Sequence, residues 1–230
     1  MNKIAIVTSI CGNRDILSDP TVVHPNVDYF AFVDKKHDCK IWNQCQVFDF
    51  STDEKYEHRR NAKLYKVLPT MFLSQYDYVF WVDATHDVVA KPEELIEKYL
   101  SFSDIAVFVH RERNCAYQEM DEIDSLGYDH LDNVSRQREF YKKEGFPENY
   151  GLYELPVILR KNTFETTKLN ILWWEQICRF SSRDQLSFTY CLWKQNIQPT
   201  VLDGYANGIN PKTGKIGNND IVPQIRNHNV

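Results

Sequence analysis

The feature that most restricts the fold of this chain is the regular alternation of short apolar runs with longer helical patterns. Short apolar runs are typical of buried strands, and apolar residues spaced three and four apart are typical of helices that cover a sheet. Alternation of this kind predicts an α/β fold with a mostly parallel sheet flanked by helices. The expected strands are residues 3–9, 28–33, 46–50, 78–83, 105–110 and 155–160. The expected helices are residues 55–72, 92–100, 114–125, 134–144, 163–180 and 183–195.

No internal repeat and no low-complexity linker interrupts this pattern, which predicts a single domain over residues 1–230. The final part, residues 201–230, collects half of the glycines together with several asparagines, a composition typical of loops. We therefore expect one domain that ends in an irregular tail. Pro69 is expected to kink or end the long helix of residues 55–72, because proline removes a backbone donor.

Glycine supplies only 8 of the 230 residues, about half of its usual share. The motifs G-x-x-x-x-G-K-[ST] and G-x-G-x-x-G are absent, which argues against a P-loop NTPase and a standard dinucleotide-binding protein. The net charge of −5 gives no basic surface for bulk nucleic-acid binding, so no nucleic-acid partner is expected. Any phosphate group must therefore be held by side chains.

The N-terminal apolar run of residues 4–7 is too short for the core of a signal peptide or for a membrane span. No later stretch approaches the roughly 18 apolar residues of a transmembrane helix. The 6 cysteines are scattered and form no C-x-x-C pair, which is typical of reduced thiols. These observations predict a cytoplasmic protein without a transmembrane segment.

The most informative stretch is the apolar run of residues 78–82, which is followed directly by Asp83. Five consecutive apolar residues indicate a strand buried on both faces and therefore central in the sheet. Ligands of open α/β sheets bind beyond the carboxyl ends of the strands, so Asp83 lies where a metal or substrate would bind. The alternative, a helix cap or turn residue, carries equal weight on this local pattern.

A basic stripe runs along the helix that precedes this strand. Arg59, Lys63 and Lys66 are spaced i, i+4, i+7, and none has an acidic partner four residues before it. A diphosphate would neutralise the stripe through charge-assisted hydrogen bonds. A solvated basic face explains the pattern equally well.

Two further polar stretches follow apolar segments. His110 and Arg113 come directly after an expected strand, where an ordinary polar loop is the alternative. Asp184 and Gln185 open an expected helix behind Ser182, so helix capping alone would explain the aspartate. The same position could instead hold a sugar hydroxyl.

In this order, five motifs resemble those of the mucilage-type glycosyltransferase-like family, which belongs to the nucleotide-sugar transferases of the GT-A fold. The motifs are T-x-x-x-G-x-x-D at residues 8–15, R-x-A-K-x-x-K at 60–66, W-[IV]-D at 81–83, H-x-x-R-x-C-x-Y-x-E at 110–119 and R-D-Q-L-S-F at 183–188. The resemblance covers about residues 3–190, most of the chain. The resemblance implies a GT-A-like, Rossmann-like sheet. It also implies a donor half up to about residue 110 and an acceptor half over about 111–200.

The resemblance further implies transfer of a sugar from a nucleotide sugar, with a UDP-sugar as the default donor, to a glycan or lipid-linked acceptor. The protein would then be cytoplasmic or peripheral to a membrane that carries the acceptor. The donor-binding residues implied are Thr8, Asp34, Arg60, Lys63, His110 and Arg113. Asp184 and Gln185 are implied as catalytic residues, at the donor sugar or the acceptor hydroxyl.

The resemblance implies a divalent cation, Mn²⁺ or Mg²⁺, with Asp83 and His228 as its ligands. The D-x-D motif usual in GT-A enzymes is incomplete, because Thr85 takes its second acidic position. His86 or Asp87 could compensate, or the basic residues could carry the charge of the leaving group without a metal. Two other classes of function remain open: a non-catalytic nucleotide- or sugar-binding module and, less favoured, a nucleotidyltransferase.

Overall fold

The computed structural model describes residues 2–12, 15–53, 55–207, 218 and 220–223. In this part of the chain, seven strands form one sheet in the order β3-β2-β1-β4-β7-β6-β8, and β5 and β9 form a small second sheet. The strand bounds are β1 Ile4–Ile10, β2 Val27–Val33, β3 Asn43–Gln46, β4 Tyr78–Val82, β5 His86–Val88, β6 Ile105–Val109, β7 Tyr153–Lys161, β8 Thr200–Val201 and β9 Ile221–Pro223. The predicted mixed α/β architecture is confirmed.

Strand β1 lies at the centre of the parallel part of the sheet. It pairs in parallel with β2, where Ile4 lies opposite Val27, and with β4, where Ile4 lies opposite Tyr78. Strand β3 extends the parallel set, whereas β7 runs antiparallel between β4 and β6. The carboxyl ends of β1, β2 and β4 therefore meet at one edge of the sheet.

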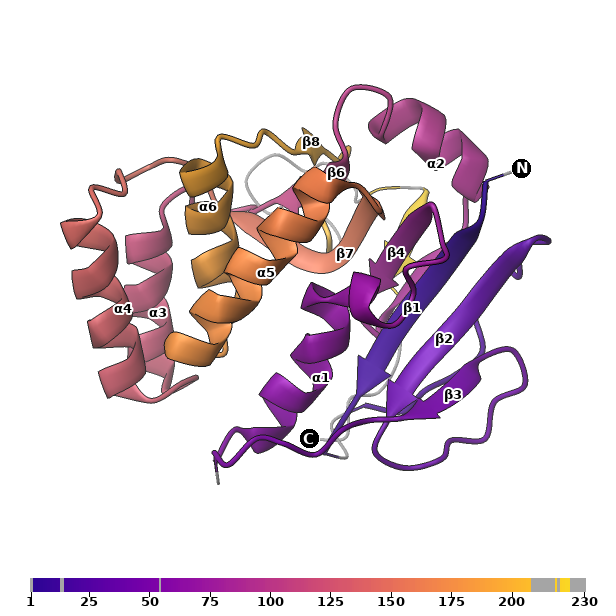
Figure 1. The fold of residues 1–230 in the computed structure, drawn as a ribbon, viewed down its shortest axis with the longest axis horizontal. Helices are drawn as coiled ribbons and strands as arrows, with labels where there is room; N and C mark the ends of the chain where they lie inside the picture. The colour runs from indigo at the N-terminus through magenta and orange to yellow at the C-terminus, as the bar shows by residue number, and fades with distance from the viewer. Residues whose placement is uncertain (1, 13–14, 54, 208–217, 219, 224–230) are drawn as a thin grey trace.

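Helices cover both faces of this sheet (Figure 1). Helix α1 packs beside α5, α5 packs beside α6, and α3 lies between α6 and α4. The helix bounds are α1 Glu57–Val67, α2 Pro92–Tyr99, α3 Ala116–Leu126, α4 Leu131–Lys143, α5 Phe164–Arg179 and α6 Asp184–Gln195, with a 3₁₀ turn η1 at Pro69–Met71.

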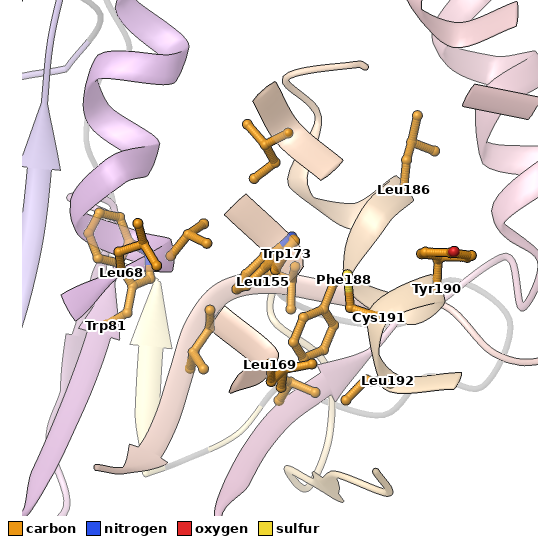
Figure 2. Packing of buried hydrophobic residues seen from close by; sticks show 14 of the residues in the cluster. Leu68, Trp81, Leu155, Leu169, Trp173, Leu186, Phe188, Tyr190, Cys191 and Leu192 are labelled. Carbon is orange, nitrogen blue, oxygen red and sulfur yellow. The ribbon is translucent and has the colours of Figure 1, made fainter. Parts of the chain in front are cut away.

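The core is divided by the sheet because strand side chains alternate between its two faces. In β4, Val79 and Trp81 face α1 and α5, whereas Phe80 and Val82 face the side that α2 covers. Many of the Phe, Tyr and Trp side chains lie in this core. In Figure 2 the rings of Trp173 and Phe188 lie together between α5 and α6, with centroids 4.8 Å apart.

Two expected elements are displaced. The strand expected at 46–50 is β3, which ends at Gln46, because its parallel partner β2 ends opposite it at Val33. The helix expected at 55–72 ends at Val67, and Pro69 opens the 3₁₀ turn in agreement with the expected interruption. Among the described helices, none is long and apolar enough to cross a bilayer.

Candidate active site

A cavity of about 840 Å³ opens at the carboxyl edge of the sheet, between the ends of β1 and β4 and one face of α1. Its walls are residues 9–12 and 15, seven residues between Lys55 and Lys66, residues 81 and 83–85, and Arg183. This edge is where ligands bind in open α/β sheets. We refer to it as the lysine cavity because of the two lysines described next.

Lys63 and Lys66 turn from α1 toward the first residue of α6. The Nζ atoms of Lys63 and Lys66 lie 2.8 Å and 2.7 Å from Oδ2 of Asp184. The side chains of Lys66 and Asp184 are 4% and 8% exposed, so both charges are withdrawn from water. Lys66 is thus part of the site. The sequence placed it in the basic stripe and in the motif of residues 60–66, but did not mark it as a site residue.

Asp83 joins this arrangement from the end of β4. Its Oδ1 accepts a hydrogen bond from Nε1 of Trp81 at 2.7 Å and lies 3.4 Å from Nζ of Lys66. The side chain of Asp83 is 42% exposed, which leaves it accessible from the cavity. The backbone carbonyl of Asp83 begins the turn into β5 by accepting a hydrogen bond from the N–H of His86. Asp83 is thus both a turn residue and a residue of the cavity wall. Lys63, Lys66, Asp83 and Asp184 form what we call the lysine–aspartate network.

Burial and pairing shift the pKa values in this network in different directions. Burial lowers the pKa of Lys63 to about 8, although Asp184 favours its charged form. Burial acts on Lys66 in the same way, but Asp184 and Asp83 outweigh it and raise the pKa of Lys66. Burial favours the neutral form of Asp184, and the two ammonium groups overcome this and hold its pKa well below the usual range. Asp184 is therefore a fixed anion and a weak proton acceptor.

The segment before α6 is fixed by Asp129, which aims Asp184 at the lysines. Oδ2 of Asp129 accepts hydrogen bonds from Oγ of Ser181 at 2.7 Å and from the backbone N–H of Ser182 at 2.8 Å. The expected Ser182 cap is wrong: the helix begins one residue later behind Arg183, and the Ser182 hydroxyl bonds to Asp129. The carboxylate of Asp184 contacts the two lysines beside the cavity, and Asp184 itself does not line it.

Thr8 and Asp34 lie beneath the cavity and do not line it. Thr8 is fully buried in β1. Oδ2 of Asp34 accepts a hydrogen bond at 2.6 Å from the backbone N–H of Gly12, in the loop after β1. Gly12 has φ +77°, and a Cβ there would lie 2.4 Å from Cδ2 of His58 in α1. Glycine thus permits the close approach of this loop to α1.

Arg60 points away from the lysine cavity. Its Nη1 lies 3.0 Å from Oδ2 of Asp53, and its Nη2 donates to the carbonyl oxygen of Phe180 at 2.8 Å. Arg59 lines the cavity in its place and also donates to the carbonyl oxygen of Tyr128. The face of α1 that lines the cavity is therefore the one that carries residues 59, 63 and 66. Arg60, the arginine matched by the motif, lies on another face.

His110 and Arg113 form a separate group at the end of β6. Nε of Arg113 lies 2.7 Å from Oε2 of Glu119, and Nε2 of His110 lies 3.8 Å from the same oxygen. Burial, with help from Arg113, lowers the pKa of His110 to about 4. Neither residue lines the lysine cavity.

Gln185 is also turned away, because its amide donates to the carbonyl oxygen of Tyr153 at 3.4 Å. The ring of His86 contacts Oγ1 of Thr85 and the carbonyl oxygen of Ala206, at 3.0 Å and 2.9 Å. Oδ2 of Asp87 accepts from the backbone N–H of Thr21 at 3.0 Å. Neither His86 nor Asp87 lines the lysine cavity.

The described residues do not fit a divalent metal ion. No group of three or more His, Cys, Asp or Glu side chains in this part of the chain could hold one. Asp83 has an ammonium group 3.4 Å from Oδ1, and that charge opposes the approach of a cation. His228, the other expected ligand, lies outside the described residues.

Fold and cavity together define the class of protein. The mostly parallel sheet flanked by helices, with its site at the carboxyl edge, is a GT-A-like α/β fold. The WbbM bifunctional glycosyltransferase is similar, with a TM-score of 0.50 and 11% identity over 84% of this chain and 38% of that chain. Mouse xyloside xylosyltransferase 1 has a TM-score of 0.47 and 12% identity over 88% of this chain and 85% of that chain.

Sequence comparison gives the family. The model of the TOD1/MUCI70 glycosyltransferase-like domain matches residues 1–203, so the chain belongs to this family. A probable hexosyltransferase of Arabidopsis thaliana, MUCI70, is 30% identical over 143 residues, 57% of this chain and 24% of that protein. The chain thus spans about a quarter of the length of this relative. The expected family and GT-A-like fold are confirmed.

Proposed function

We propose that the lysine cavity binds a nucleoside diphosphate sugar and that the protein transfers the sugar to a hydroxyl group of a glycan or lipid-linked acceptor. The observation that carries this proposal is the lysine–aspartate network at the carboxyl edge of the sheet. Two ammonium groups converge there on one buried carboxylate, within 2.8 Å. UDP-sugars are the first donors to test.

The lysines supply the electrostatic part of the reaction. The bond between the anomeric carbon and the diphosphate oxygen breaks, and its electron pair leaves with the diphosphate. The acceptor oxygen forms the new bond to that carbon, and its proton passes to water. Lys63 and Lys66 then stabilise the negative charge that develops on the leaving diphosphate.

Asp184 and Asp83 have different roles in this proposal. Asp184 positions both lysines and can accept hydrogen bonds from hydroxyl groups of the donor sugar. It does not remove the acceptor proton, because its pKa lies well below the usual range. Asp83, 42% exposed at the cavity wall, is better placed to contact the bound donor.

We further propose that donor binding needs no divalent cation, because Lys66 stands where a cation would contact Asp83. Manganese or magnesium should therefore add little to donor affinity. This part of the proposal is independent of the transfer reaction and is tested in the same experiment.

The test is a thermal-shift panel of UDP-, GDP- and CDP-sugars with EDTA and with manganese. A donor that binds the native protein raises its melting temperature by mass action. We expect one nucleotide class to stabilise the protein in EDTA, and mass spectrometry to detect glycosylated product when acceptor glycans are added. A flat panel under both conditions would contradict the proposal. Stabilisation without any donor consumption would instead favour a non-catalytic binding module.

A further inference from the structure

A second hollow of about 710 Å³ adjoins the lysine cavity. It lies between the loop before α1, the beginning of α4 and the end of α5, and Lys55 lines both it and the lysine cavity. In Figure 1 these three segments meet beside the lower end of α1. We call this hollow the second cavity.

The floor of the second cavity is held rigidly and its charges are paired. Nη1 of Arg60 lies 3.0 Å from Oδ2 of Asp53, and Nε2 of His130 lies 3.0 Å from Oδ1 of the same carboxylate. The guanidinium group of Arg60 also donates to the carbonyl oxygens of Ile177 and Phe180 in and after α5. Two Lys and Arg side chains line the second cavity, Lys55 and the paired Arg60, whereas five line the lysine cavity. The second cavity is therefore the less suited of the two to a phosphate or carboxylate ligand.

The wall of the second cavity combines an accessible aromatic ring with uncharged polar groups. Phe50 is 42% exposed, and its ring packs edge-on against Trp174 with centroids 5.9 Å apart. Ser51, Thr52 and Asn133 line the same cavity. Hydroxyl and amide groups of this kind both donate and accept hydrogen bonds.

We infer that the second cavity binds a neutral sugar ring of the acceptor. Phe50 offers an apolar surface to the C–H face of the ring, and Ser51, Thr52 and Asn133 form hydrogen bonds with its hydroxyl groups. Apolar walls with a few polar groups are typical of small-molecule sites. The inference that a sugar binds here depends only on the residues of the cavity. The inference that this sugar is the acceptor rests on the proposed function.

The position of the second cavity fits the acceptor role. The acceptor hydroxyl must reach the anomeric carbon of the donor, so the two binding sites must adjoin. Lys55 is shared between the two cavities, and Tyr56 holds the intervening segment by donating to the carbonyl oxygen of Gly127 at 2.8 Å. A glycan bound over Phe50 would thus extend toward the lysine–aspartate network.

The test uses the whole chain and a panel of neutral methyl hexosides, methyl pentosides and their disaccharides. Binding is measured by saturation-transfer NMR and by the fluorescence of tryptophan, since Trp174 contacts Phe50. We expect at least one glycoside to bind, and Phe50→Ala and Asn133→Ala to weaken it by about tenfold, equivalent to ~1.4 kcal/mol. Phe48→Ala is the matched control: Phe48 is 60% exposed in the same loop and does not line the second cavity.

Three results would overturn the inference: no glycoside binds, Phe48→Ala weakens binding as much as Phe50→Ala, or inorganic phosphate displaces the glycoside. Circular dichroism of each variant distinguishes loss of the site from loss of the fold. Phe50→Ala and Asn133→Ala are two separate tests of the site, because they change different residues of the cavity lining. UDP, GDP and CDP are titrated in parallel. If one of these nucleotides binds and no glycoside does, the acceptor site is wrong while the proposed function stands. If glycosides bind and no nucleotide does, the acceptor role and the proposed function both fail.

Discussion

At the scale of single residues, the site depends on charges that compensate one another away from water. Lys66 and Asp184 are both almost fully buried, and each has the other as a partner at 2.7 Å. A buried ion pair of this kind costs desolvation energy and is weak evidence for stability. Its presence at the carboxyl edge of the sheet is therefore better explained by ligand binding than by folding.

The affinity for a nucleoside diphosphate should fall as pH rises through about 8, because Lys63 then loses its charge. Bound diphosphate raises the pKa of Lys63, so the fall begins near pH 8 and continues up to the higher pKa of the complex. Calorimetric titration of UDP from about pH 7 to about pH 9.5 should show a loss of about tenfold. Lys63→Arg, which stays charged, should show no such loss, and an equal fall in both proteins would contradict the assignment.

The contribution of Lys63 to the free energy of unfolding changes with pH in the opposite direction to UDP affinity. Its pKa in the folded protein, about 8, lies below the 10.5 of an unperturbed lysine. Between these values the unfolded chain binds more protons, so this group makes the protein more stable as pH rises. The fall in UDP affinity therefore cannot be attributed to unfolding caused by Lys63.

Replacing Asp184 with asparagine should lower the free energy of unfolding by about 3–5 kcal/mol, because it leaves buried ammonium groups without their closest partner. Urea denaturation measures this. Asp203→Asn is the control, since that side chain is 71% exposed and pairs with Lys98 at 2.9 Å. An exposed pair should contribute at most about 1 kcal/mol. Equal losses in the two variants would show that Asp184 is not a buried partner of the lysines.

At the scale of elements, α1 shows what the sequence can and cannot predict. Helical spacing placed Arg59, Lys63 and Lys66 on one face, and that face lines the lysine cavity. The motif instead favoured Arg60, which lies about 100° further around the helix. Its side chain reaches Asp53 and the end of α5. Those contacts join segments far apart in the sequence, so no local pattern could reveal them.

The same limit explains the other departures. Spacing alone gave no reason to bring Asp184 to Lys66, because the pairing depends on how α6 packs beside α5 and α5 beside α1. His110 and Arg113 pair instead with Glu119, an acidic residue of their own motif. The ends of β1, β2, β4 and β6 were predictable from apolar runs, whereas those of β3 and the partners across the fold were not.

The loop after β1 should tolerate no side chain at position 12. Gly12→Ala combines a positive φ with a Cβ only 2.4 Å from His58, so it should cost more than the roughly 1–2 kcal/mol of the left-handed conformation alone. Gly127→Ala isolates that conformational cost, because φ there is +62° and nothing lies within 4 Å of its Cβ. Thermal unfolding of both variants measures the difference. Equal destabilisation would show that the loop and α1 are not in contact.

At the scale of the whole molecule, sheet order brings distant motifs to one place. Strand β1 lies between β2 and β4, so the loop after β1 and Asp83 after β4 face the same cavity. Helix α6 contributes Asp184 from the other half of the chain. The scarcity of glycine agrees with this design, because side chains rather than backbone loops supply the charges of the proposed diphosphate site.

The most direct measurement is a crystal structure of the protein with the nucleoside diphosphate sugar that stabilises it most. We expect the diphosphate oxygens within hydrogen-bond distance of Nζ of Lys63 and Lys66, and the sugar beside Asp184. A diphosphate bound instead at Arg60 and Lys55 in the second cavity, with the lysine–aspartate network unchanged, would contradict the proposed function.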